Sequence, residues 1–498
     1  MAAMNPKTLG VFAAGLLAGS AAAEPVTVTL KNTETGGPMA DVRVDQSRKR
    51  SGLGRLAGSP YALVSSQKTD NDGTIVFDDN PREGIYEVYT NTRSPLDFEA
   101  NGNKAVVEPS TATYLRGRIR MYEIAFTDNG KKLRVSDSTS YVRDSSGVAT
   151  AYIGTYTDAN GSKGIYRVRV DKDKGVIGAP ELVAEVGDPS FLALDWKGNH
   201  LYAVAESANK AFAYGLGNEE GPLEFLNDVE TGAGPCHVAV GSFWWPGKMV
   251  VSNYGDGGMA AWELEGKDGR IGKQVALFQN THASQATARQ DKPRAHSVEI
   301  LSGTPWLLAA DLGADRVYVY EQDTSSNITP HKTAPWIELP PGRGPRHILA
   351  VEAKNTVHLY VLNELSNSVC VYTFDEKTGL AAFVEEVGTL PADFSGESFA
   401  AAIKYGSETV LFASNRGHDS IARFQRDPKT GRLTLMECVP CGGAWPRDFA
   451  IMPGSPLMLV ANQRSNNISA FTIAKDGTLS PAPEGGVELG APACVVFE

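Results

Sequence analysis

The chain has 498 residues, more than one ordinary domain, and 42% of them are hydrophobic, as is typical of a globular protein. A formal net charge of −11 argues against a general nucleic-acid binder, so any anion site must be a local basic pocket. Five Cys in so long a chain do not indicate a disulfide framework, and Cys438-x-x-Cys441, which has no second pair to complete a metal set, is interpreted as structural.

The first residues have the pattern of an export signal. Lys7 precedes an apolar run, Leu9–Ala18, and small residues follow up to Ala23, which fits an A-x-A cleavage site before Glu24. No later apolar run approaches the ~20 residues that a membrane-spanning helix needs. We therefore expect a signal peptide at residues 1–23 and an exported protein, periplasmic or secreted, without a membrane span.

A small β-sandwich is expected over residues 24–137, where segments such as VTVTLKN, DVRVDQS and GIYEVYT alternate around turns. The segments NTETGGPMADVRV, TDNDGTIVF and GIYEVYT loosely resemble the transthyretin-like hydroxyisourate hydrolases, whose chemistry relies on histidines. This region has no His, since the first in the chain is His200. We interpret it as a non-catalytic binding or packing module, able to contact a protein or a carbohydrate, or as a different β-sandwich altogether. A polar linker is expected at 138–147.

Residues 148–498 repeat one pattern seven times. A core segment of the type LYAVAE or LYVLNE recurs about every 50 residues, and the copies begin at Tyr152, Leu201, Met249, Trp306, Leu359, Leu411 and Leu457. A segment led by Pro or a small residue, such as PCHVAVG, precedes each later core segment, and an alternating segment such as SVCVYTF follows it. With a more variable fourth segment, each unit has the four short strands of a β-propeller blade.

The C-terminal segment indicates how the ring closes. The unit that begins at Tyr152 lacks an opening strand, and Pro492–Phe497 can supply one. Closure would remove the exposed sheet edges that an open array carries. The predicted fold is therefore all-β, with a seven-bladed β-propeller over 148–498 that is closed by its C-terminal strand and preceded by the small β-sandwich.

Propeller geometry predicts that distant polar residues meet at one mouth of the channel. The opening strand of a blade is innermost and the second strand runs antiparallel to it, so the start of one and the end of the other share a face. The side chains at these corners are polar or charged: Glu206, His237, Arg294, His296, Asp311, Arg346, His347, Glu364, Arg416, Arg447 and Asp448.

Some polar corners have a structural interpretation. We favour turn caps for Asn253, Asn415 and Asn462 and a turn position for His418. Asp311 fits a turn cap and the site equally well. Arg447 and Asp448 fit either the site or an ionic contact between blades.

The remaining residues favour proton-transfer chemistry on an anionic substrate. Nothing matches a nucleophile elbow or a zinc set, and neither a metal nor a cofactor is expected. Arg346 and Arg416 could hold a phosphate or carboxylate, His296 could move a proton, and Glu364 could orient it or activate water. These four are the catalytic candidates, and the substrate-binding candidates are His237, Asp311, His347 and Arg447. The expected partner is a small anionic lactone or its acid.

The blades resemble the lactonase family of seven-bladed propellers, which includes bacterial 6-phosphogluconolactonases and fungal carboxymuconate-lactonizing enzymes. The resemblance rests on YIGTYT, GPCHVAV, RAHSVEI, GPRHILAVE, LYVLNELSNSVCVY and FASNRGHDSIARF. It implies an active site at His296 in RAHSV, Arg346 in GPRHI and Glu364 in LNELSN, with Arg416 in SNRGHD as a further arginine. GPRH and SNRGHD are more similar to the phosphogluconolactonase branch.

Three functions follow as hypotheses. The first is metal-independent hydrolysis of a sugar or organic-acid lactone, and the second is a carboxymuconate-type cycloisomerase. The third is a non-catalytic propeller that binds a protein or carbohydrate, for which Trp244–Trp245 in a loop could provide a contact surface.

Overall fold

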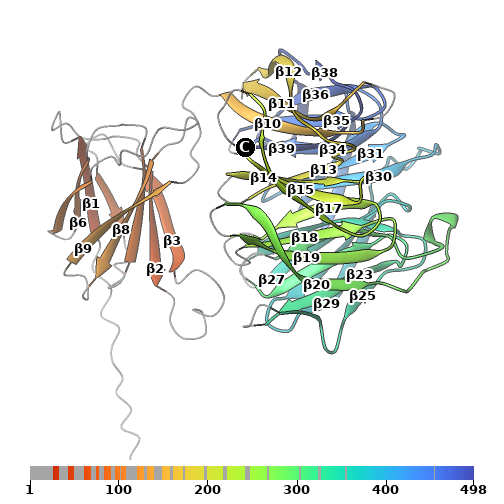
Figure 1. The fold of residues 1–498 in the computed structure, drawn as a ribbon, viewed down its shortest axis with the longest axis horizontal. Helices are drawn as coiled ribbons and strands as arrows, with labels where there is room; N and C mark the ends of the chain where they lie inside the picture. Colours follow the sequence, from red (N-terminus) through yellow and green to blue (C-terminus); the bar gives the residue numbers. More distant parts are fainter. Residues whose placement is uncertain are drawn as a thin grey trace, which may run out of the picture. The chain divides into compact units, whose positions relative to one another are not determined.

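A computed structural model describes the backbone of nine strands between Val26 and Thr139. It also describes residues 148–498 apart from gaps at 158–160, 172–173, 196–198, 217–220, 242–246, 266–267, 302–303, 324–326, 354–355 and 454 (Figure 1). The predicted signal peptide, most of the predicted linker and the Trp244–Trp245 loop lie outside the described residues. Among the described residues, no helix has the length and apolar character needed to cross a bilayer.

The N-terminal unit contains two antiparallel sheets. The first has the order β4-β1-β6-β7 and comprises β1 (Val26–Asn32), β4 (Thr74–Phe77), β6 (Leu96–Ala100) and β7 (Asn103–Val107). The second has the order β3-β2-β5-β8-β9 and comprises β2 (Arg43–Lys49), β3 (Tyr61–Lys68), β5 (Gly84–Thr90), β8 (Arg120–Thr127) and β9 (Lys132–Thr139). Two sheets are what a β-sandwich requires, while the transthyretin-like resemblance stays a prediction.

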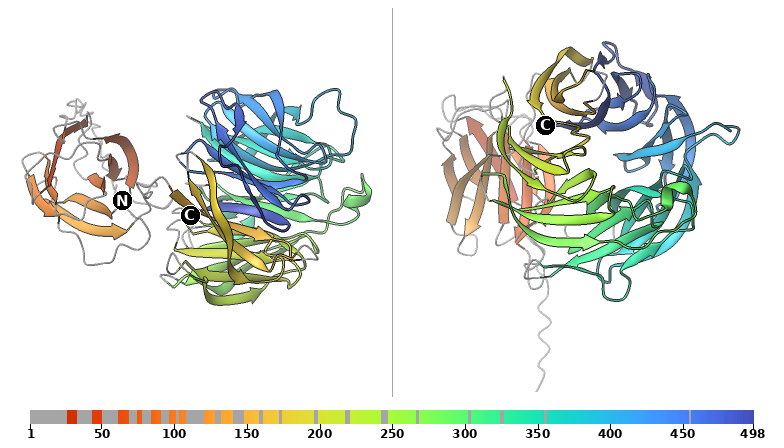
Figure 2. Two further views of the ribbon diagram at one scale, coloured as in Figure 1. Left: turned by 90° about the horizontal axis from the view of Figure 1, so that it is seen from above. Right: turned by 45° about the vertical axis from the view of Figure 1, so that its right-hand side comes forward.

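Seven antiparallel sheets follow, and Figure 2 shows them arranged as a ring of blades. Blade 1 comprises β39 (Pro492–Phe497), β10 (Val148–Thr155), β11 (Gly164–Asp171) and β12 (Gly175–Glu185); blade 2 comprises β13 (Phe191–Leu194), β14 (His200–Ala205), β15 (Lys210–Gly215) and β16 (Glu224–Glu230); blade 3 comprises β17 (Pro235–Val240), β18 (Lys248–Asn253), β19 (Gly258–Glu265) and β20 (Arg270–Gln279). A short 3-10 helix, η2 (Ala288–Gln290), lies between blades 3 and 4.

The other four blades have the same strand order. Blade 4 comprises β21 (Ala295–Ile300), β22 (Trp306–Asp311), β23 (Arg316–Gln322), β24 (Ile328–Pro330) and β25 (Trp336–Glu338); blade 5 comprises β26 (Pro345–Ala353), β27 (Thr356–Asn363), β28 (Ser368–Asp375) and β29 (Leu380–Gly388); blade 6 comprises β30 (Phe399–Ser407), β31 (Val410–Arg416), β32 (Ser420–Arg426) and β33 (Leu433–Pro440); blade 7 comprises β34 (Pro446–Ile451), β35 (Leu457–Asn462), β36 (Asn467–Ile473), β37 (Leu479–Pro481) and β38 (Val487–Glu488). The seven-bladed fold predicted from the repeats is confirmed.

The C-terminal strand closes the ring as predicted. Strand β39 is the innermost strand of blade 1 and pairs antiparallel with β10, with Val495 opposite Ile153 and Val496 opposite Tyr152. Val495 belongs to a buried cluster that also contains Leu457 and Leu459 of blade 7. The closing strand is therefore held by backbone pairing to blade 1 and by apolar packing against blade 7.

The hydrophobic core lies between the blades, which explains why the second strands are almost uninterruptedly apolar. In β27, Leu359 and Val361 pack in a cluster with blade 4, whereas the alternating Tyr360 and Leu362 pack with blade 6. Both faces of the strand are thus buried, and each such side chain contributes about 1.5–3 kcal/mol to stability by leaving water. Polar side chains are accommodated at the strand ends, where the mouth forms.

Candidate active site

A β-bulge at the start of the inner strand places one side chain of most blades at the mouth. In β26, Pro345 pairs with Asn363 and His347 with Leu362, so Arg346 is an extra residue without an opposite partner. The same one-residue shift leaves the following residues extra: Cys236 in β17, His296 in β21, Arg447 in β34 and Ala493 in β39. Strand β30 shifts between Ala400 and Ile403, whereas β13 pairs without a shift. Bulges re-aim side chains, and here they carry three of the predicted site residues.

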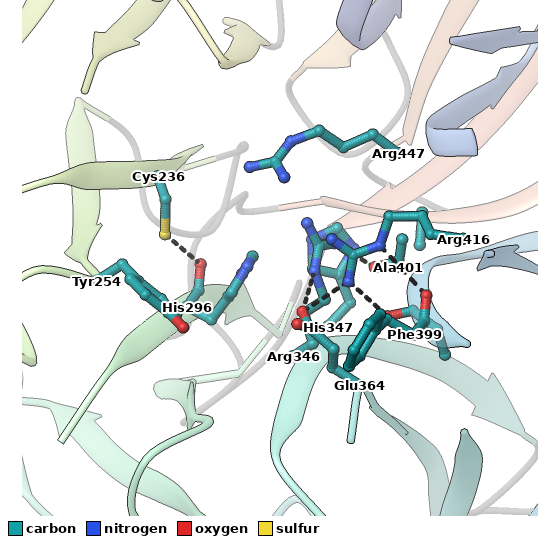
Figure 3. Close-up of polar contacts among 12 residues, drawn as sticks. Cys236, Tyr254, His296, Arg346, His347, Glu364, Phe399, Ala401, Arg416 and Arg447 are labelled. Carbon is teal, nitrogen blue, oxygen red and sulfur yellow. Dashed lines mark hydrogen bonds and ion pairs between the residues drawn. The ribbon is translucent and has the colours of Figure 1, made fainter. Parts of the chain in front are cut away.

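Glu364, the residue after β27, is surrounded by three arginines (Figure 3). Its Oε2 lies 2.8 Å from Arg416 Nη2 and 3.0 Å from Arg346 Nε, and its Oε1 lies 2.5 Å from Arg289 Nη1. Only 3% of the Glu364 side chain is exposed. Burial would raise the pKa of Glu364, but Arg416, Arg346 and Arg289 lower it to about 2. Glu364 is therefore ionised at physiological pH and anchors three cations.

The two buried arginines have further partners that fix their orientation. Arg346 donates from Nη1 to the carbonyl of Ala401, and Arg416 donates from Nε to the Phe399 carbonyl at 3.2 Å. Burial, with the nearby Arg416 charge, lowers the pKa of Arg346 to about 9. Both guanidinium groups are thus largely occupied within the protein, and they act on the mouth mainly through their charge.

Three histidines lie next to this cluster. The ring centroid of His347 lies 5.7 Å from that of His237 and 5.6 Å from that of His296. Burial, reinforced by Arg346 and other cations, lowers the pKa of His296 and His347 well below 6.5, and burial with Lys404 and Arg346 lowers that of His237 to about 3. All three are neutral imidazoles at physiological pH. His296 Nδ1 is buried and has no hydrogen-bond partner among the described residues.

A second carboxylate cluster centres on Glu206, the residue after β14. Its Oε1 accepts hydrogen bonds from Tyr156 at 2.9 Å and from Ser190 at 2.5 Å, and it lies 3.6 Å from Arg447 Nη2. The Arg447 guanidinium also lies 5.0 Å from the centroid of the Tyr156 ring. Figure 3 shows the Arg447 side chain extending toward the space beside His296 and Arg416.

Two of the polar residues predicted at the mouth, Asp311 and Asp448, bind other parts of the propeller. Both oxygens of Asp311 are occupied: Oδ1 accepts from the backbone N–H groups of Arg294, Gly313 and Ala314, and Oδ2 accepts from Asn280 at 2.8 Å. This is the turn-cap alternative for Asp311, and the side chain is fully buried. Asp448, the residue after the bulge in β34, forms an ion pair with Lys404 of blade 6 at 3.2 Å. Asp448 therefore makes an ionic contact between two blades.

The residues predicted as caps have mixed environments. Asn415 donates to the Thr389 carbonyl at 2.8 Å, and Asn462 donates to Ser469 at 3.0 Å. His418 lies within hydrogen-bonding distance of Ser420, 2.7 Å away in the same turn. Asn253 is buried, and its side chain has no hydrogen-bond partner among the described residues.

Sequence reasoning missed four residues of the site, one of which is Ser190, the residue before β13. The sequence analysis placed at the mouth the residues at the start of each first strand and at the end of each second strand, which we call the corner rule. Tyr254 and Tyr156 directly follow strand ends, so extending the corner rule by one position would have found them. Tyr254 accepts a hydrogen bond from Arg289 at 2.7 Å. Arg289 lies in η2, between two blades, and no strand-end pattern points to it.

No group of three His, Cys, Asp or Glu suited to hold a metal ion occurs among the described residues. The five cysteines are all free thiols, including Cys438 and Cys441. Cys236 occupies a bulge position, and its Sγ lies 3.3 Å from the carbonyl oxygen of His296.

The family model, two curated relatives and a solved structure that match this chain are all described as lactonases. The family model described as "Lactonase, 7-bladed beta-propeller" matches residues 150–497. A 6-phosphogluconolactonase of Bacillus subtilis is 31% identical over 357 residues, which cover 70% of this chain and 97% of the relative. One from Formosa agariphila is 30% identical over 361 residues, 70% of this chain and 99% of the relative. Among solved structures, the periplasmic gluconolactonase of Pseudomonas aeruginosa is 28% identical with a TM-score of 0.63, and the match covers 70% of this chain and 99% of that one.

Proposed function

We propose a substrate for this chain, which belongs to the family of seven-bladed β-propeller lactonases and hydrolyses a lactone. The proposed substrate is the lactone of a six-carbon sugar acid. It binds at the mouth between His296, Glu364 and Arg447. The relatives named 6-phosphogluconolactonase and the solved gluconolactonase support this substrate class.

The observation that carries the proposal is the state of Arg447. Arg289, Arg346 and Arg416 are all held by Glu364, whereas Arg447 has one ion pair at 3.6 Å and one aromatic contact among the described residues. Its guanidinium therefore retains donors for the carbonyl oxygen of a lactone or the carboxylate of the product. We therefore propose that Arg447, rather than Arg346 or Arg416, anchors the substrate. Arg346 and Arg416 contribute positive charge near the site.

Hydrolysis requires stabilisation of an oxyanion and movement of one proton. Water attack on the lactone carbonyl places negative charge on its oxygen, and Arg447 with the cations around Glu364 would stabilise that charge among largely buried side chains. His296 is the proton-transfer group of this proposal, because it is buried and neutral and its Nδ1 has no partner among the described residues. His237 and His347 are proposed to border the substrate.

We further propose that the enzyme works outside the cytoplasm. The Lys7, Leu9–Ala18 and Ala21–Ala23 pattern supports export, as does the likeness to a periplasmic gluconolactonase. Export favours an unphosphorylated lactone. N-terminal sequencing of protein recovered from the culture medium or periplasm should begin at Glu24, and full-length protein confined to the cytoplasm would contradict export.

An acid-release assay tests the function. Purified protein should accelerate proton release from glucono-1,5-lactone above the spontaneous rate, and 6-phosphoglucono-1,5-lactone and a muconate serve as comparison substrates. We expect hydrolysis of the unphosphorylated lactone, and His296→Ala should lose at least about 100-fold in kcat while keeping its melting temperature within a few degrees. Muconate cyclisation without lactone hydrolysis would favour the cycloisomerase, and an unchanged kcat in His296→Ala would remove His296 from the mechanism.

A further inference from the structure

Lactone hydrolysis needs a base with a lone pair that water can reach, and Glu364 does not provide one. Both of its oxygens contact arginines, only 3% of its side chain is exposed, and its proton affinity is very low. A carboxylate that binds three cations so tightly gains little by taking a proton from water. The water-activating role considered for Glu364 is therefore unfilled.

Glu206 occupies the position in blade 2 that Glu364 occupies in blade 5. Each is the residue immediately after the second strand of its blade, β14 or β27. Their surroundings differ sharply, because 26% of the Glu206 side chain is exposed. Tyr156, Ser190 and Arg447 all approach the same oxygen, Oε1. Oε2 has no hydrogen-bond or ion-pair partner among the described residues.

This arrangement orients one oxygen and leaves the other available. Two hydroxyl donors from separate segments of the chain, Tyr156 and Ser190, fix the carboxylate plane. Arg447 lies beside it and extends toward His296 (Figure 3). Oε2 of this partly exposed side chain is thus beside the guanidinium that anchors the substrate, where an attacking water would lie.

We propose that Glu206 is the general base of the hydrolysis, an inference that rests on the proposed function. Oε2 takes a proton from water while the water oxygen forms a bond to the lactone carbonyl carbon. The carbonyl π electrons move to its oxygen, which Arg447 stabilises. When that intermediate collapses, the ring C–O bond breaks, and Nδ1 of His296 takes the proton held by Glu206 and passes the same proton to the ring oxygen. Glu206 and His296 return to their initial states, and water and lactone have become the hydroxy acid.

The alternative role for Glu206 is to hold Arg447 in place, and the two roles give different kinetics. In Glu206→Gln the amide oxygen can still accept from Tyr156 and Ser190, but the side chain cannot take a proton. We expect kcat to fall about 100- to 10,000-fold with KM changed less than about threefold. Glu230→Gln, at an exposed carboxylate of the same blade, is the matched control and should keep wild-type kinetics.

Chemical rescue separates catalysis from positioning. Glu206→Ala should recover at least about tenfold in kcat when formate is added, because a small carboxylate can enter the vacated and partly exposed position. Circular dichroism and the melting temperature of each variant establish that it is folded. The proposal is overturned by a kcat within about threefold of wild type in folded Glu206→Gln, by a raised KM with an unchanged kcat, or by the absence of rescue. A wild-type protein inactive on every lactone would instead contradict the proposed function.

Discussion

Arg346 Nη1 lies 3.1 Å from Nε2 of the adjacent His347, so two basic residues next to each other in the chain share a hydrogen bond. A guanidinium can only donate, so Nε2 of His347 must accept, and the imidazole is neutral with its proton on Nδ1. Burial, reinforced by the charge of Arg346, holds the pKa of His347 well below 6.5, so His347 adds no further positive charge to the site.

The buried neutral state of His347 predicts acid sensitivity. Burial, followed by Arg346, holds its folded-state pKa well below 6.5, so the unfolded chain binds the extra proton as the pH falls. The free energy of unfolding should decrease by about 1.4 kcal/mol per pH unit for each such histidine below pH 6.5. His347→Gln, whose amide oxygen can still accept from Arg346, should show a smaller slope between pH 6.5 and 5 in urea unfolding.

Comparing variant with wild type removes other titrations from that measurement. Burial raises the pKa of Glu299 to about 7 and that of Asp311 to about 6, and both groups are present in the two proteins. Equal slopes for wild type and His347→Gln would mean that His347 is not buried in the neutral form.

Removing the charge of Glu364 should be costly even without any substrate. Glu364→Gln leaves Arg346 and Arg416 buried without their carboxylate, which typically costs about 3–5 kcal/mol. Because the pKa of Glu364 is lowered to about 2, its ionic contribution is complete above pH 4.5 and is lost only as the pH falls toward 2. Calorimetry at pH 7 should therefore show a clearly lower melting temperature.

A surface pair provides the control for Glu364. Glu437 pairs with Arg423 at 2.7 Å but is partly exposed, so Glu437→Gln should cost less than about 1 kcal/mol. Equal losses in the two variants would contradict the buried network at the mouth.

The fold could be predicted from the sequence because seven repeats carry the same pattern. The partners of each site side chain could not be predicted in this way. The closing strand was predicted at Pro492–Phe497 and has those bounds, since an incomplete first blade admits few partners. The corner rule also brought Arg346 and Glu364 together, with His296 beside His347, which Arg346 contacts. It could not show that Arg346 is occupied by Glu364, because pairing depends on side-chain direction. Arg289 was missed because it reaches Glu364 from a loop between blades.

Closure by β39 predicts that a single buried residue near the C-terminus controls the stability of the propeller. Val495 is 2% exposed between blades 1 and 7. Val495→Asp would place a carboxylate in that core, so we expect little soluble, folded protein. Val495→Ala removes only methyl groups and should cost about 1–3 kcal/mol in chemical unfolding. A Val495→Asp protein with a wild-type melting temperature would show that the closing strand is dispensable.

The free cysteines predict insensitivity to reductants. All five thiols are unpaired, and four of them are buried. Burial raises the pKa of Cys441 to about 12 and also raises that of Cys438, so reactive thiolate is scarce. Ellman's reagent should modify at most Cys438 quickly in the folded protein and all five thiols after denaturation, and dithiothreitol should leave the melting temperature unchanged. A reductant-dependent fall in melting temperature would reveal a disulfide.

The bulges at the starts of the inner strands allow the side chains at the mouth to vary independently of the strand pairing. Each inserts one residue and leaves the ladder paired on both sides, so a substitution at Cys236, His296, Arg346, Arg447 or Ala493 changes the mouth without altering any register. These five positions form a small combinatorial set for redirecting the enzyme to other esters. Ala493 is only 1% exposed, so a larger side chain at that position would have to displace neighbouring atoms.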